Sequence, residues 1–176
     1  MIGIGKEFIS NEGSKFKIEE ILSKRRVKIK FLDCYGYSYE VDKSSILKGQ
    51  VANPYYKSNR GFGFYGVGKY KSCLNSKPTR EYNTWTCMIR RVFSEKNHKT
   101  QPTYKNVYIC EDWANFQIYA EWYTSNYPRI EGVNFEIDKD LLQQNVRDKI
   151  YSPSTCIFLP HNVNSFLANK QLNNTY

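Results

Sequence analysis

Cysteine is scarce in this 176-residue sequence, and its spacing fits neither a zinc site nor a disulfide framework. The number of cysteines is odd, and no two of them have the C-x-x-C spacing of a zinc ribbon. We therefore expect free thiols in a reducing compartment. The five cysteines are Cys34, Cys73, Cys87, Cys110 and Cys156.

Long apolar runs are also missing from the sequence. No stretch of about 18 residues is apolar throughout, so we expect no membrane-spanning helix and no membrane partner. The first residues lack the apolar core of a signal peptide, which predicts a protein that is not secreted. Histidine is rare as well, with only His98 and His161 in the whole chain.

What the sequence does contain is typical of a folded protein. Apolar residues make up 40% of the chain and aromatic residues 16%, which excludes the composition of a disordered chain. The length suits one domain, or two small ones, with a core of useful size.

The positive charge is concentrated in the first half of the chain. Residues 1–80 hold 16 Lys and Arg against 7 Asp and Glu, whereas residues 81–176 hold 10 of each, so the first part carries the whole net charge of +9. A concentrated positive field attracts polyanions, of which nucleic acid is the commonest. The alternative is a basic protein whose charge serves only solubility.

Residues 1–50 have the pattern of a small, basic β-barrel of SH3-like size. The segments 16–22, 26–32 and 37–41 alternate or run apolar, with turn residues between them. Val27, Ile29 and Phe31 are expected to point inward, which leaves the basic residues on a cationic face that binds DNA. An equally good interpretation is an edge strand protected by lysines. The basic residues are Lys24, Arg25, Arg26, Lys28 and Lys30.

Residues 51–80 form a basic connector that is rich in glycine and aromatic residues. Arg60, Lys69 and Lys71 alternate with phenylalanine and tyrosine. Glycine lets a backbone approach a ligand closely, and aromatic rings stack on bases, so we predict DNA contacts here. The alternative is an irregular linker whose aromatic rings pack on the folded parts. The run GFGFYGVG lacks the βαβ context of a dinucleotide-binding fingerprint.

Residues 81–176 predict an α+β domain. Apolar side chains recur at helical spacing in residues 80–93 and again in 111–127, with a strand at 107–110 between them. Residues 133–138 and 155–159 read as strands separated by a polar loop, 139–150. Pro160 then suits the first turn of a helix that reaches about residue 168. The expected order at the end of the chain is strand, loop, strand and helix, a ββα unit.

Several motifs follow one another in a definite order along the chain. They are Tyr82-x-x-Trp85-x-x-Met88-x-x-Arg91, Pro102-x-Tyr104, Asp112-Trp113-x-x-Phe116, IDKDLL and KIYSPSTCIFLPHNVN. Their order resembles a group of bacteriophage proteins identified as HNH endonucleases of the His-Me finger type. The resemblance covers nearly the whole chain, and it implies a phage protein that acts on double-stranded DNA in the host cytoplasm. It also implies a ββα finger that holds one divalent ion, Mg²⁺ or Mn²⁺.

One position departs from the family pattern. The His-x-Asp at the end of the first strand falls on Asp138-Lys139-Asp140, and a shift of one residue places Lys139 at the histidine position with Asp138 as the metal ligand. The middle Asn of the pattern falls on Thr155, whereas the last Asn or His matches Asn164. The resemblance therefore implies a metal site of Asp138 and Asn164 without the usual base.

His161 is a candidate for the missing base or ligand. It precedes Asn164 by three residues, so the two share a helix face. The alternative is an exposed histidine without a role. The candidate catalytic residues are accordingly Asp138, Lys139 and His161, while His98 is expected on the surface.

Three functions remain open at this point. The first is a DNA-binding protein of the HNH endonuclease-like family whose cleavage chemistry is weakened or lost. The second is an active metal-dependent endonuclease of the nicking or homing type. The third is a phage accessory protein that binds a host protein, such as one of a defence system, through its tyrosine-rich surface.

Overall fold

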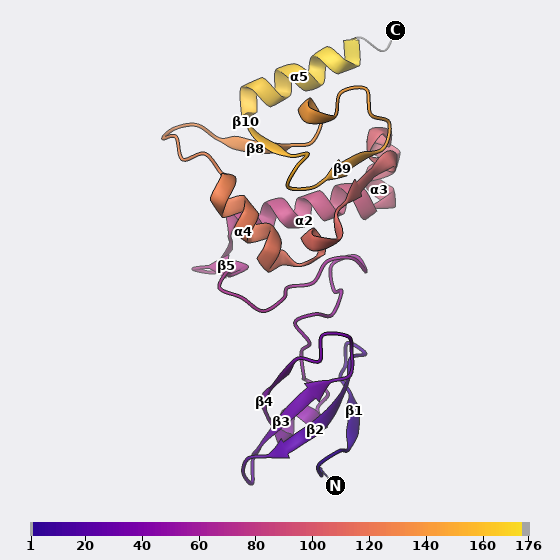
Figure 1. The fold of residues 1–176 in the computed structure, drawn as a ribbon, viewed down its shortest axis with the longest axis vertical. Helices are drawn as coiled ribbons and strands as arrows, with labels where there is room; N and C mark the ends of the chain where they lie inside the picture. The colour runs from indigo at the N-terminus through magenta and orange to yellow at the C-terminus, as the bar shows by residue number, and fades with distance from the viewer. Residues whose placement is uncertain (1, 174–176) are drawn as a thin grey trace. The chain divides into compact units, whose positions relative to one another are not determined.

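The protein is a mixed α+β structure. The computed structural model describes the backbone of residues 2–173 and the side chains of residues 2–167. Over this range it contains a four-stranded antiparallel sheet and five α-helices (Figure 1). The chain divides into two compact units, residues 1–56 and 57–176, each with its own apolar core. Most of the glycine-rich connector thus belongs to the second unit.

The first unit is an antiparallel sheet in the order β1-β2-β3-β4. Val27, Ile29 and Phe31 are buried, as their alternation along β3 predicts. Among the described residues the sheet is not closed by pairing of β1 with β4, so the SH3-like barrel stays a prediction. The elements are β1 (Glu7–Ile9), β2 (Lys15–Ile21), β3 (Arg26–Phe31), β4 (Ser38–Asp42) and α1 (Lys43–Leu47).

Helix α2 (Arg80–Phe93) organises the core of the second unit. It begins at Thr79, whose hydroxyl accepts a hydrogen bond from the Tyr82 N–H. Its buried stripe consists of Trp85, Met88, Ile89 and Val92, at the spacing that the sequence predicts. The Trp85 indole N–H donates to the Trp113 carbonyl at 2.8 Å, which fixes α2 against the next helical segment.

The predicted helix over 111–127 is wrong at its start. A 3₁₀ turn, η2 (Glu111–Ala114), is followed by α4 (Phe116–Asn126), and Asn115 between them is extended and caps α4. Phe64 explains the interruption, because its N–H donates to the Ala114 carbonyl and its carbonyl accepts from the Phe116 N–H. A chain segment fifty residues away thus takes the backbone groups that a continuous helix would have used.

Four short strands of the second unit form two pairs. Strand β7 (Val107–Ile109) pairs in parallel with β9 (Lys149–Tyr151), which lies in what was predicted to be a polar loop. Strand β8 (Phe135–Asp138) pairs antiparallel with β10 (Ile157–Pro160), and α5 (His161–Asn173) follows β10 directly. The remaining elements are the β5 (Cys73–Leu74) and β6 (Lys77–Pro78) hairpin, α3 (Glu95–Thr100), η1 (Pro102–Asn106) and η3 (Leu141–Gln143).

None of the helices in the described part of the chain is long and apolar enough to cross a membrane. The longest, α2, has 14 residues and a strongly polar outer side.

Candidate functional site

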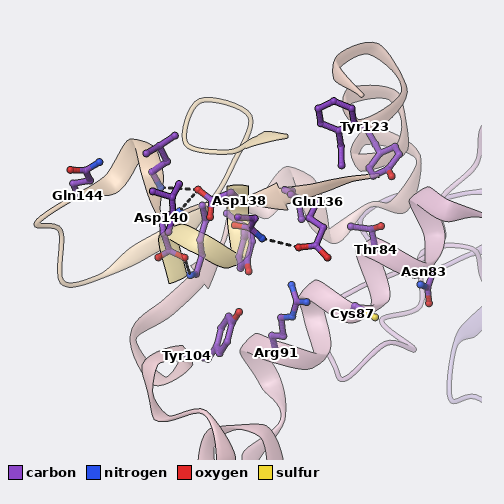
Figure 2. A pocket seen from close by; sticks show the side chains of 17 residues that line it. Asn83, Thr84, Cys87, Arg91, Tyr104, Tyr123, Glu136, Asp138, Asp140 and Gln144 are labelled. Carbon is purple, nitrogen blue, oxygen red and sulfur yellow. Dashed lines mark hydrogen bonds and ion pairs between the residues drawn. The ribbon is translucent and has the colours of Figure 1, made fainter. Parts of the chain in front are cut away.

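A polar cavity of about 610 Å³ lies between α2, β8, the turn after β8, and α5 (Figure 2). Helix α2 forms one wall, and β8, the turn after it and α5 form the other. The strand and helix residues predicted from the sequence to hold a metal, Asp138 and Asn164, both line it. The charged and amide side chains that line the cavity are Arg91, Glu136, Asp138, Lys139, Asp140 and Asn164.

Glu136 is the residue that joins β8 to α5. One of its oxygens is 2.9 Å from His161 Nδ1, and the other accepts a hydrogen bond from Asn164 Nδ2 at 2.9 Å. Partial burial would raise the pKa of Glu136, but the bonds from Asn164 and His161 outweigh it, so the pKa lies below its usual range. Two residues of the helix therefore meet one carboxylate of the strand.

Sequence reasoning did not nominate Glu136 as a site residue. A signal existed, because Glu136 precedes Asp138 by two residues, and residues at that spacing point to the same face of a strand. The partners of Glu136, however, come 25 and 28 residues later. Only the pairing of β8 with β10 brings them together.

Asp138 is buried, and its carboxylate closes the turn after β8. Its Oδ1 accepts hydrogen bonds from the N–H groups of Asp140 at 3.0 Å and Leu141 at 2.8 Å. This is the local capping role that aspartate often takes in turns. The predicted partner of Asp138, Asn164, instead donates its hydrogen bond to Glu136.

Lys139 is held in the interior by contacts that suit an ammonium group. Its Nζ lies 2.8 Å from Asp140 Oδ2 and over the rings of Tyr104 and Tyr151, at 5.0 and 5.6 Å from their centroids. Lys149 binds the other oxygen of Asp140. These contacts indicate that Lys139 helps to hold the 139–150 segment in place. Its catalytic role stays a prediction.

The Asp140 ion pairs predict acid-sensitive stability. Burial would raise the pKa of Asp140, but Lys139 and Lys149 outweigh it and the pKa lies below its usual range. A lowered folded-state pKa contributes stability above the unfolded value of about 3.9, and this stability is lost as the pH falls through the folded value. Thermal unfolding between pH 7 and pH 3 should thus show a smaller loss of stability for Asp140→Asn than for the wild type. Equal losses in both proteins would contradict this ion-pair account.

The described residues were also compared with the ligand clusters that hold metal ions in proteins. Among residues 2–167, no group of three His, Cys, Asp or Glu side chains lies close enough together to hold a metal ion. The Mg²⁺ or Mn²⁺ site at Asp138 and Asn164 stays a prediction. His98, the other histidine, lies in α3 and is half-buried, whereas the sequence predicts it on the surface.

The predicted cationic face of the first unit is partly neutralised. Arg26 forms a salt bridge with Glu40 at 3.3 Å, and Lys28 forms one with Glu19 at 3.1 Å. Within the described residues, Lys24, Arg25 and Lys30 form no salt bridge. Lys24 and Arg25 are exposed in the turn that joins β2 to β3. Of the five basic residues of the predicted cationic face, these three are thus the ones whose charge no salt bridge among the described residues offsets.

The basic residues of the connector have different surroundings. Lys69 pairs with Glu121 at 3.1 Å and lies over the Tyr70 ring. Arg60 is exposed in a left-handed turn with φ of 56°, and Lys71 is exposed as well. Two aromatic rings between them stack on other rings of the second unit: Phe62 on Phe93 and Tyr65 on Phe116. These contacts favour packing over base stacking for the two rings.

Comparisons of the chain with known protein families, curated proteins and solved structures find no match.

Proposed function

We propose that this chain is a phage-encoded DNA-binding protein of the HNH endonuclease-like family, with cleavage chemistry that is weakened or lost. It acts on double-stranded DNA in the host cytoplasm. Its first unit is an SH3-like module, and residues 133–168 are the ββα finger. The proposal rests on the order of motifs in the sequence together with the arrangement of β8, β10 and α5.

The observation that supports the finger best is the contact of Glu136 with α5. Strands β8 and β10 pair antiparallel, α5 follows without a linker, and His161 and Asn164 from its first turn meet Glu136. Polar groups of a strand and a helix thus face each other beside a cavity, as a nuclease-type finger requires. The exposed Lys24 and Arg25 and the half-buried Lys30 supply charge for the DNA backbone.

Weakened cleavage is inferred from the groups at the end of β8. A general base must reach the proton that it removes. Asp138 is engaged with two backbone N–H groups, and Lys139 is engaged with Asp140. Neither group is placed to take a proton from water.

A second candidate, the active metal-dependent endonuclease, is favoured by the orientation of His161. Its Nδ1 faces Glu136, which leaves Nε2 of an exposed imidazole available as a proton acceptor. A carboxylate that fixes one ring nitrogen in this way orients the other for base catalysis.

A plasmid assay separates the two candidates. Supercoiled plasmid is incubated with the protein and Mg²⁺ or Mn²⁺, and gel retardation and nicking are measured in the same samples. We expect retardation without nicking. Nicking by the wild type that is lost in His161→Ala would establish the endonuclease instead. Absence of retardation at low salt would contradict DNA binding altogether.

A further inference from the structure

Arg91 occupies the wall of the cavity that faces β8. It is on the last turn of α2, half-buried, and its side chain points into the cavity beside Tyr104 (Figure 2). Burial would lower the pKa of Arg91, but the oxygens of Tyr104 and Tyr151 outweigh this and the pKa lies above its usual range. The guanidinium therefore stays charged at the wall of the cavity, where it is half-buried.

The carboxylates of the cavity are all occupied by other groups. Glu136 bonds to His161 and Asn164, Asp138 closes its turn, and Asp140 binds two lysines. Among the described residues, Arg91 forms no salt bridge with any of them. The Arg91 side chain hydrogen-bonds to Tyr151, and its charge acts on Glu136 from beyond salt-bridge distance. The charge of this half-buried cation is thus only partly compensated, which favours an anion as a further partner.

We propose that Arg91 binds a phosphate group inside this cavity, and that a DNA backbone phosphodiester is its occupant. The planar guanidinium presents paired N–H donors that match two phosphate oxygens, which makes arginine the preferred side chain for such an anion. The cavity volume of about 610 Å³ accommodates a phosphodiester with its sugar and lies in the usual range for ligand sites.

This inference rests on the proposed function and adds a contact point to it. The phosphate would lie between α2 and the first turn of α5, next to His161 and Asn164. Arg91 would then hold the backbone at the finger, whereas Lys24, Arg25 and Lys30 hold it elsewhere through charge. We expect the site to hold one anion. A second anion would be repelled by the Glu136 carboxylate, and Arg91 would already be bound to the first.

The test compares Arg91 with its neighbour on the same helix. Arg90 is exposed and does not line the cavity, so Arg90→Met and Arg91→Met remove the same charge from nearly the same place. Binding of a fluorescein-labelled duplex by the full chain is followed by anisotropy over a range of salt. We expect Arg91→Met to weaken binding about tenfold or more and to reduce the salt slope by about 0.9. Arg90→Met should weaken it by less than about threefold.

Two further measurements distinguish a loss of phosphate binding from a loss of folding. Circular dichroism and thermal unfolding show whether each variant is folded. Arg91→Lys keeps the charge but loses the paired N–H donors, so its loss of duplex affinity should lie between zero and that of Arg91→Met. Orthophosphate is also titrated into the ¹⁵N-labelled wild type, where the Arg91 side-chain N–H resonance, assigned by its loss in Arg91→Lys, should shift.

The outcomes separate the two proposals. If the wild type binds the duplex but Arg91→Met behaves as Arg90→Met does, the phosphate site is overturned and DNA binding stands. If the wild type binds no duplex but orthophosphate shifts the Arg91 resonance, the anion site stands and DNA binding falls. A resonance that does not move with orthophosphate or duplex overturns the phosphate site.

Discussion

DNA binding by this protein should weaken about a thousandfold when the salt concentration rises from about 50 to 200 mM. Each phosphate neutralised by a lysine or arginine releases condensed counterions, and about six such contacts produce a loss of this size. The net charge of +9 lies entirely in residues 1–80. Anisotropy titrations of a labelled duplex at several salt concentrations give the slope directly.

The salt bridges of the first unit provide a matched control for this expectation. Replacing Lys24, Arg25 and Lys30 by alanine removes cations without a salt bridge among the described residues, so the salt slope should fall by nearly three. Replacing Arg26 and Lys28, which pair with Glu40 and Glu19, should lower it by much less. A salt slope near zero in the wild type would contradict the proposed contacts with the DNA backbone. So would equal changes in slope for the two sets of substitutions.

Trp85→Ala should destabilise the second unit by about 3–5 kcal/mol. The Trp85 ring is fully buried and packs on Tyr82 and Phe116. Its indole also satisfies the Trp113 carbonyl, which would lose its partner. Gly63 adds to the tight packing, because a Cβ there would lie 2.7 Å from the Trp85 ring. Urea unfolding followed by tryptophan fluorescence measures the change.

Fluorescence is specific to this unit, because all three tryptophans lie in residues 85–122. Trp85→Phe serves as the control: it keeps an aromatic ring in the core but removes the indole N–H, so its loss should be clearly smaller. An unfolding midpoint of Trp85→Ala equal to that of the wild type would show that α2 does not anchor this core.

Local patterns predicted the elements whose stability is local. The stripe of Trp85, Met88, Ile89 and Val92 defined α2 from one end to the other, because this periodicity lies within the helix itself. The alternation in β3 likewise gave its buried face. The strands β8 and β10 were found to within two residues for the same reason.

Features that depend on distant partners were missed. Strand β9 exists because it pairs with β7, forty residues earlier, and its three residues carry no alternation of their own. Lys139 sits in a charged run that suggests exposure, yet Tyr104, Tyr151 and Asp140 make its burial favourable.

The sequence drew attention to residues that line the cavity but did not predict their contacts. The family pattern drew attention to Asp138 and Asn164, and both line the cavity. Strand register decided the rest: Glu136, rather than Asp138, meets the helix. Arg91 was part of a quoted helix motif, but its approach to the cavity depends on how α2 packs against β8, which no local pattern encodes.

Hydrogen–deuterium exchange of the full chain, with and without a DNA duplex, tests the central claim most directly. The account predicts slower exchange in two places when DNA is added: the β2–β3 turn around Lys24 and Arg25, and the first turns of α5 around His161 and Asn164. Unchanged exchange in both segments at low salt, with or without protection elsewhere, would contradict it.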